Sequence, residues 1–310
     1  MKRLLLVLLA ACGGGGGDEP CELDGNFCEH LSSYRMLDDA IAYDINTPLF
    51  SDYTTKQRAI YLPPGGAMTW SDTDAFAMPV GAAVMKTFSY PGRPLETRLL
   101  VRTAAGWTGA SYVHDGDDAR LALAGAQLTV DWGRYSVPNK NQCKNCHAEH
   151  DDAVDLIGPK ARHLNRGEQL QRFIADGLLV GAPPPETWPR APVATDPSSG
   201  SLDARARAWL DINCAYCHNS RGGAARTSGL YLDLDATDVG VCKPPVAAGR
   251  GSGGRAYAIV PGDPDASFLV YRIESTEPDI RMPELGRNLV DAEGVALIRE
   301  WIAAMPGSCN

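Results

Sequence analysis

Two copies of one five-residue pattern constrain this chain more than any other feature. Residues 143–147 read CKNCH and residues 214–218 read CAYCH, with no further similarity between the copies. In a helical turn, residues three and four apart share one face, so each copy brings two thiols and an imidazole together. Each copy therefore predicts a compact site with two sulfur atoms and one ring nitrogen.

Covalent haem attachment requires this arrangement, because the thiols add to the vinyl groups at one haem edge and the imidazole reaches the iron. We predict two covalently bound haem c groups. The predicted attachment residues are Cys143 and Cys146 for the first haem and Cys214 and Cys217 for the second, with His147 and His218 as the proximal iron ligands.

Three other interpretations of the motifs are weaker. A zinc site could use both cysteine pairs, but it gives no reason for a histidine after each pair. A thioredoxin-like redox pair would need a βαβ setting, which the sequence lacks. Chance could explain one copy more easily than two.

The distal ligands differ between the two predicted haems. Met282, in the stretch RMPELG, is the candidate for the second haem, and His/Met ligation raises the potential and suits electron transfer. The alternative is that Met282 only fills the core. No methionine lies between His147 and residue 195, so His163 is the candidate for the first haem and would give a lower potential.

Further possibilities for the first haem stay open. His150 lies too close in sequence to His147 to reach the opposite face of the same iron. An open or water-bound iron would suggest catalysis. The remaining candidates, all from the preceding segment, are Met68, Met78, Met85 and His114.

The start of the chain predicts export and lipid anchoring. Lys2 and Arg3 precede a short apolar run that ends in small residues and Cys12, as in a bacterial lipoprotein signal. Five glycines follow and would form a flexible tether. Gly13 rather than Asp after the cysteine favours the outer membrane, so we expect lipid anchoring on the periplasmic side of the cell envelope.

The remaining cysteines fit an oxidising compartment. Nine cysteines are present, and assigning Cys12 to lipid and four to haem leaves four for disulfides. We predict Cys21–Cys28 and Cys242–Cys309 as the pairs, although the sequence alone does not fix the connectivity. The net charge of −9 argues against a nucleic-acid partner.

The rest of the sequence predicts an α+β multidomain protein. Short runs with turn residues between about 45 and 137 indicate an antiparallel β domain, sandwich-like or barrel-like. Helical patterns follow at 167–179, after Ser201 and after Asp291. We divide the chain into signal and tether (1–20), β domain (21–137), first haem domain with linker (138–200) and second haem domain (201–310), the last two small and α-helical.

Several stretches carry a family resemblance. LDARARAWLDINCAYCHN, IVPGDPDASFLVYRI, RMPELG and DAEGVALIREWIAAM together resemble a class I cytochrome c domain, in which the methionine matching Met282 is the distal ligand. From about residue 33 to the end, the chain resembles exported dihaem c-type cytochromes with an N-terminal β domain. The stretches NTPLFSDYTTKQRAIYLPPG, VPNKNQCKNCH and CKPPVAAGRGSGG carry that wider resemblance.

These features lead to three functional hypotheses. The first is an electron carrier between a periplasmic redox donor and an acceptor protein. The second is an oxidoreductase, similar to a dihaem peroxidase, with an open first haem. No catalytic residue can be assigned for it, because Glu149, Asp151 and Asp152 are ordinary surface-loop residues. The third is a partner-binding or sensor protein that acts through the β domain.

Overall fold

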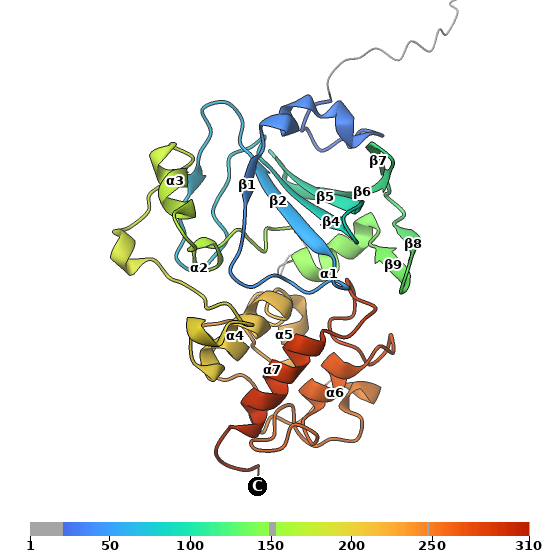
Figure 1. The fold of residues 1–310 in the computed structure, drawn as a ribbon, viewed down its shortest axis with the longest axis vertical. Helices are drawn as coiled ribbons and strands as arrows, with labels where there is room; N and C mark the ends of the chain where they lie inside the picture. The colour runs from blue at the N-terminus through green and yellow to red at the C-terminus, as the bar shows by residue number, and fades with distance from the viewer. Residues whose placement is uncertain (1–20, 149–152, 247, 310) are drawn as a thin grey trace, which may run out of the picture.

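The computed structural model describes residues 21–148, 153–246 and 248–309, and shows a β-rich part above a helical part (Figure 1). The predicted α+β class is confirmed. The predicted signal, tether and lipidation site at residues 1–20, including Cys12, lie outside the described residues. So do Glu149, His150, Asp151 and Asp152.

The β part is built on one six-stranded antiparallel sheet. In spatial order its strands are β1 (Ile41–Tyr43), β2 (Thr55–Tyr61), β4 (Ala83–Ser89), β5 (Pro94–Thr103), β6 (Gly106–Asp115) and β7 (Asp118–Leu121). A separate hairpin pairs β8 (Ala126–Val130) with β9 (Gly133–Val137). The main sheet is open, with β1 and β7 at its edges, so the expected barrel-like closure is not found in the described part of the chain.

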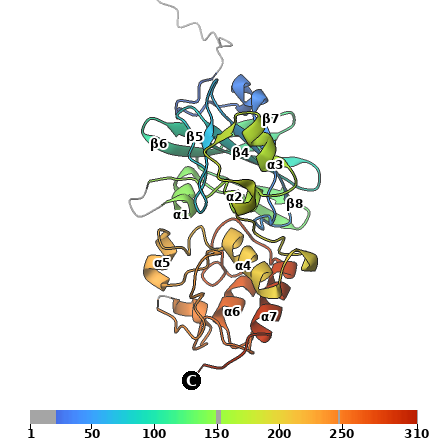
Figure 2. The same ribbon diagram turned by 90° about the vertical axis from the view of Figure 1, so that its left-hand side faces the viewer.

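One face of the sheet packs against the N-terminal segment. Alternate residues of β5 and β6, such as Leu99 and Tyr112, point to this face and form a core with Tyr34 and Leu37. This segment contains the 3-10 helices η1 (Leu31–Ser33) and η2 (Arg35–Asp39), which lie on the opposite side of the sheet from α1 and α2 (Figure 2). The predicted Cys21–Cys28 disulfide is present in this segment.

The other face carries two apolar clusters. Around Ile60 it packs against residues such as Leu164 and Phe173, and around Phe88 it packs against the β8–β9 hairpin. The elements of residues 138–200 are η3 (Lys140–Gln142), α1 (Cys143–His147), α2 (Ala161–Leu164), α3 (Gln169–Ala175), β10 (Leu179–Val180), η4 (Pro185–Thr187) and η5 (Pro197–Ser199). β10 pairs with β3 (Met68–Thr69) of the preceding segment.

This packing changes the expected domain division. We predicted that residues 138–200 form a small haem domain, but α2, α3 and β10 share a hydrophobic core with the sheet. The segment completes the core of the β part.

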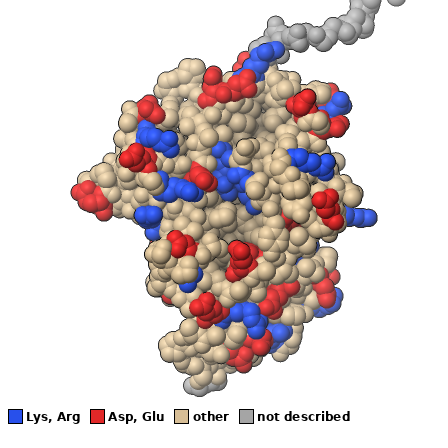
Figure 3. Space-filling model, viewed as in Figure 1, with Lys and Arg blue, Asp and Glu red and all other residues tan. Residues whose placement is uncertain are grey.

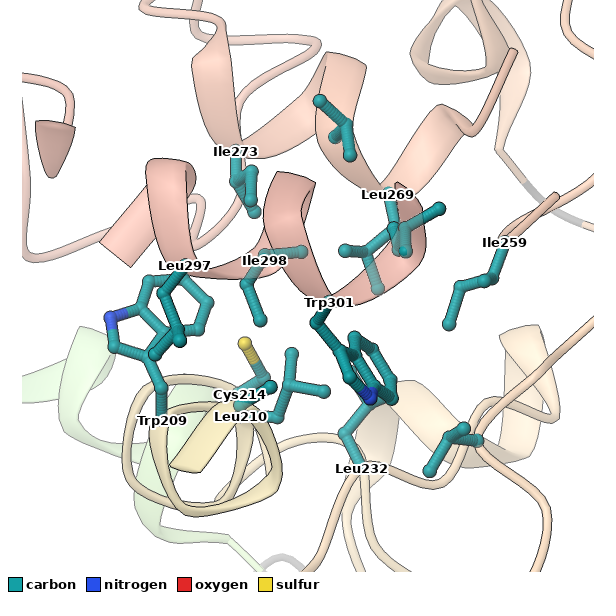
Figure 4. Packing of buried hydrophobic residues seen from close by; sticks show 14 of the residues in the cluster. Trp209, Leu210, Cys214, Leu232, Ile259, Leu269, Ile273, Leu297, Ile298 and Trp301 are labelled. Atoms are coloured by element: carbon teal, nitrogen blue, oxygen red, sulfur yellow. The ribbon is translucent and has the colours of Figure 1, made fainter. Parts of the chain in front are cut away.

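The C-terminal part is helical and packs around its own core. Its elements are α4 (Leu202–Asn213), α5 (Gly223–Ser228), η6 (Gly249–Ser252), α6 (Phe268–Glu274) and α7 (Ala292–Ala303). Ser201 and Asp291 cap α4 and α7 as predicted, each accepting a hydrogen bond from a backbone N–H of the first turn. Figure 4 shows α4, α6 and α7 meeting through residues such as Leu210, Leu269 and Ile298.

The predicted Cys242–Cys309 disulfide ties the end of the chain to the helical part.

None of the helices in the described ranges is both long enough and apolar enough to cross a bilayer.

Two buried polar contacts join the β part to the helical part. Asp52 is only 1% exposed, and its carboxylate accepts hydrogen bonds from the backbone N–H groups of Asn288 (2.6 Å) and Leu289 (2.7 Å). Asp211 of α4 contacts Arg162 and His163 of α2. Because buried charges are stabilised only by close partners, these contacts fix how the two parts meet.

Candidate functional site

The second Cys-x-x-Cys-His motif forms a turn directly after α4. The backbone N–H of His218 donates to the carbonyl of Cys214 at 3.0 Å, so the motif keeps the i to i+4 spacing that the sequence predicts. The sulfur of Cys214 lies in the apolar core beside Leu210 and Ile298 (Figure 4).

This motif opens into a cavity of about 420 Å³. Cys214, Cys217, His218 and Met282 all line it, so the structure brings together every residue predicted for the second site. Its apolar wall is formed by Leu230, Leu232, Phe268, Leu269 and Ile273. Thiols, an imidazole and a thioether around an apolar cavity are the donor set and surroundings that a covalently attached haem needs.

The environment of His218 suits a metal ligand. Its Nδ1 lies 3.4 Å from the Ser228 hydroxyl. Burial lowers the pKa of His218 to about 4, so the imidazole is neutral at physiological pH. A neutral ring oriented through Nδ1 presents Nε2 to a metal.

The loop that carries Met282 is held by a buried arginine that sequence reasoning missed. Arg287 is 4% exposed and donates to the carbonyl of Met282 through Nε (3.0 Å) and Nη2 (2.7 Å). Its other contacts reach the carbonyls of Arg272 (3.1 Å), Ser275 (2.9 Å) and Leu289 (3.0 Å). Arg287 therefore ties the Met282 loop to the end of α6.

Replacing Arg287 with lysine should loosen this loop. Lysine keeps the charge but loses the planar fork, so several buried carbonyls lose their donors at a cost of about 1–3 kcal/mol in the free energy of unfolding. Denaturant titration measures the effect. Arg281→Lys, in the same loop but more exposed, is the matched control and should change stability by about 0.5 kcal/mol. Equal effects of the two substitutions would contradict a positioning role for Arg287.

The first motif lies on α1, under the sheet. The Nδ1 of His147 is 2.9 Å from the backbone carbonyl of Asp155, which again leaves Nε2 for a metal. Burial lowers the pKa of His147 to about 4, and the nearby charges of Lys86 and Arg98 add to the shift. The ring is therefore neutral and suitable as a ligand at physiological pH.

The two motifs touch each other near their second cysteines. The Cys217 thiol donates to the carbonyl of Asn145 at 3.1 Å, directly beside Cys146 in the chain. Cys146 lines the same cavity as Cys217. Within the described residues, no group of three or more Cys, His, Asp or Glu side chains is arranged to hold a metal ion.

The structure places His163 in the contact between the two parts of the protein. His163 is 5% exposed, and its Nε2 lies 2.7 Å from Asp211, which also binds Arg162. The Nδ1 of His163 is buried without a partner in the described structure. Ligation of the first haem by His163 stays a prediction, and ligation through Nε2 would require the contact with Asp211 to break.

The other candidates for the first distal ligand are also placed. His114 bonds the Thr97 hydroxyl through Nε2 (2.9 Å), on the sheet face that packs against the N-terminal segment. Met85 packs on that same face, away from α1. Met68 and Met78 belong to the apolar cluster under α2 and α3.

Comparison with known proteins gives one match. A family model described as Planctomycete cytochrome C matches residues 214–285, which include the second motif and Met282. No curated protein and no solved structure matches the chain. The C-terminal part is therefore cytochrome c-like, which implies covalently bound haem c and points to electron transfer in general.

Proposed function

We propose that this protein is a dihaem c-type cytochrome that transfers electrons between a donor and an acceptor protein. The closeness of the two motifs carries the proposal, because the Cys217 thiol contacts the carbonyl of Asn145 at 3.1 Å and Cys146 and Cys217 line one cavity. Because these are the second attachment cysteines of the two motifs, two attached haems would have neighbouring edges. A chain with this arrangement can pass single electrons from one redox partner, through two adjacent sites, to another.

The residues of the second site perform distinct tasks. His218 and Met282 line one cavity and would bind the iron, while Cys214 and Cys217 would fix the macrocycle. The apolar wall would limit the access of water to the iron, and with a thioether ligand this would raise the potential. When bound, haem supplies the one-electron redox chemistry. Arg287 holds the Met282 carbonyl and so limits the movement of the distal ligand.

We also propose the cellular setting. A lipid on Cys12 would hold the protein on the periplasmic side of the envelope, with the outer membrane favoured by Gly13. The disulfides Cys21–Cys28 and Cys242–Cys309 support an oxidising compartment. The redox partners would then be periplasmic proteins.

A second candidate function is an oxidoreductase with an open first haem. The observation that favours it is the engagement of His163 with Asp211, which holds the predicted distal ligand elsewhere. Carbon monoxide separates the two candidates, because it binds ferrous haem only where the sixth position is free. We expect no rapid binding for the carrier, and rapid binding to one haem per chain for the oxidoreductase.

The haem content is the direct test of the proposed function. Protein matured in a bacterium with a cytochrome c assembly pathway should show the mass of the polypeptide plus two haems, and reduced low-spin c-type bands. A variant with Cys143→Ala and Cys146→Ala should lose one haem and keep the other. Colourless protein, or a wild-type mass with a single haem, would refute the dihaem proposal.

A further inference from the structure

The sheet face toward α1 carries a row of like charges. The strand register places Arg58 of β2 opposite Lys86 of β4, and Lys86 opposite Arg98 of β5. Directly opposite residues of an antiparallel pair have their side chains on one face, and like charges there are destabilising. A row of three cations therefore needs anions to offset it. We call these three residues the cationic row.

The described residues supply too little negative charge for this row. Glu96 is fully buried and pairs with Arg98 at 2.6 Å, but Asp44 lies 3.9 Å from Arg58 and closer, at 3.0 Å, to Arg166. Arg58 is 7% exposed, and its Nη2 is buried without a hydrogen-bond partner. One guanidinium nitrogen of the row is thus desolvated and uncompensated, which is costly unless a ligand binds it.

Lys86, at the centre of the row, shows the same deficit. Its ammonium lies 5.4 Å from the centre of the Phe88 ring and has no hydrogen bond or ion pair within the ranges that the structure describes. Burial lowers its pKa to about 7, and the charges of Arg98, Arg58 and Lys56 add to the shift. Figure 3 shows basic side chains gathered at the centre of the face drawn there, over the sheet.

The cationic row faces the first haem-attachment motif. The charges of Lys86 and Arg98 act on both His147 and the Cys146 thiol, so these two residues of the row lie near α1. The 3-10 helix η3, which leads directly into α1, contacts β6, and α1 lies beneath the sheet (Figure 2). Apolar clusters flank the row on the same face, around Ile60 and around Phe88.

We propose that the cationic row binds the propionate carboxylates of the haem attached at Cys143 and Cys146. This inference rests on the proposed function. A haem is an apolar plate with carboxylates at one edge, and the face offers apolar clusters beside unsatisfied cations. Guanidinium groups bind carboxylates through paired hydrogen bonds, and the free Arg58 nitrogen and the Lys86 ammonium supply the donors. The β part is then a wall of the first haem site.

The reduction potential of the first haem tests this proposal. A nearby cation disfavours the oxidised iron, which carries the greater positive charge, so removing the cation should lower the potential. Lys86→Met, similar in length, and Arg58→Gln should each change the reduction equilibrium about tenfold, or about 59 mV for one electron. Lys86→Arg should keep the wild-type potential. Spectroelectrochemical titration of the full chain with both haems resolves the two potentials.

The controls separate this inference from the proposed function. Arg93→Gln, in the exposed turn between β4 and β5, removes a charge outside the row and should leave both potentials unchanged. The potential of the second haem should not respond to any of these variants. An unchanged first potential in two-haem Lys86→Met and Arg58→Gln proteins would overturn the inference and leave the function intact. A wild-type first potential that shifts with added inorganic phosphate would also overturn it, because the row would then hold an exchangeable anion.

Discussion

Replacing Met282 with alanine should lower the potential of the haem attached at Cys214 and Cys217 and free its sixth position. Met282 and His218 line the same cavity, so the substitution removes the thioether donor without changing the proximal ligand. Because the thioether stabilises the reduced iron, we expect the reduction equilibrium to change more than about tenfold, or about 59 mV for one electron. Redox titration and carbon monoxide binding to the reduced protein measure the two effects.

A second methionine of the same part of the protein provides the control. Met305 packs against the apolar core of the helices but does not line the cavity. A buried methionine replaced by alanine costs about 2–5 kcal/mol in the free energy of unfolding. Met305 is only partly buried, so Met305→Ala should cost less than this and leave the potential of the haem unchanged. If Met282→Ala and Met305→Ala gave the same potential as the wild type, Met282 would not be a ligand.

Local signals in the sequence predicted the secondary structure of this protein well. The strands β2, β4, β5, β6 and β8 lie within the range of about 45–137 that was predicted to form the β domain, because alternation and turn residues act over a few neighbouring positions. Ser201 and Asp291 cap their helices for the same reason. Counting left four cysteines for disulfides once the motifs had been assigned, and both predicted pairs are present.

The contacts that position the site depend on tertiary packing and were missed. Nothing near Arg287 in the sequence indicates that its guanidinium reaches carbonyls as far back as Arg272. Asp52 adopts a left-handed backbone conformation, with φ of 50°, and binds backbone groups of Asn288, far along the chain. The cationic row appears only when the register places Arg58, Lys86 and Arg98 side by side.

The packing of residues 138–200 on the sheet could not be predicted from the sequence for a related reason. Proline-rich and polar stretches around residues 183–200 suggest a linker, and the first motif suggests a haem domain of its own. Hydrophobic residues of α2 and α3 instead complete the core on the sheet, where Ile60 lies. Local sequence pattern does not show whether such a segment forms a domain of its own or packs on a distant sheet, because both arrangements bury the same hydrophobic residues.

Replacing Asp211 with asparagine should strongly destabilise the protein. Asp211 binds Arg162 through two hydrogen bonds (2.8 and 3.1 Å) and His163 at 2.7 Å, and its carboxylate is 3% exposed. Removing one partner of a buried ion pair leaves the other uncompensated, at a cost of about 3–5 kcal/mol. Denaturant titration at neutral pH would measure the loss in the free energy of unfolding.

Asp235 is the matched control, because it binds the same guanidinium at 2.8 Å but has a side chain that is 64% exposed. Solvent screens that pair, so Asp235→Asn should cost about 0–1 kcal/mol in the free energy of unfolding.

The pH dependence of the stability gives a second test of the role of Asp211. Burial alone would raise the pKa of Asp211, but the hydrogen bond and charge of His163 and the charge of Arg162 outweigh it and lower the pKa.

A carboxyl group with a lowered folded-state pKa stabilises the protein above its unfolded pKa of about 3.9, and this contribution disappears as the pH falls through the folded-state value. The stability difference between wild type and Asp211→Asn should therefore be constant near neutral pH and shrink below about pH 4. A difference that stayed the same into acid would mean that the contact between α2 and α4 does not depend on the Asp211 charge. The join between the two parts would then rest on apolar packing and on Asp52.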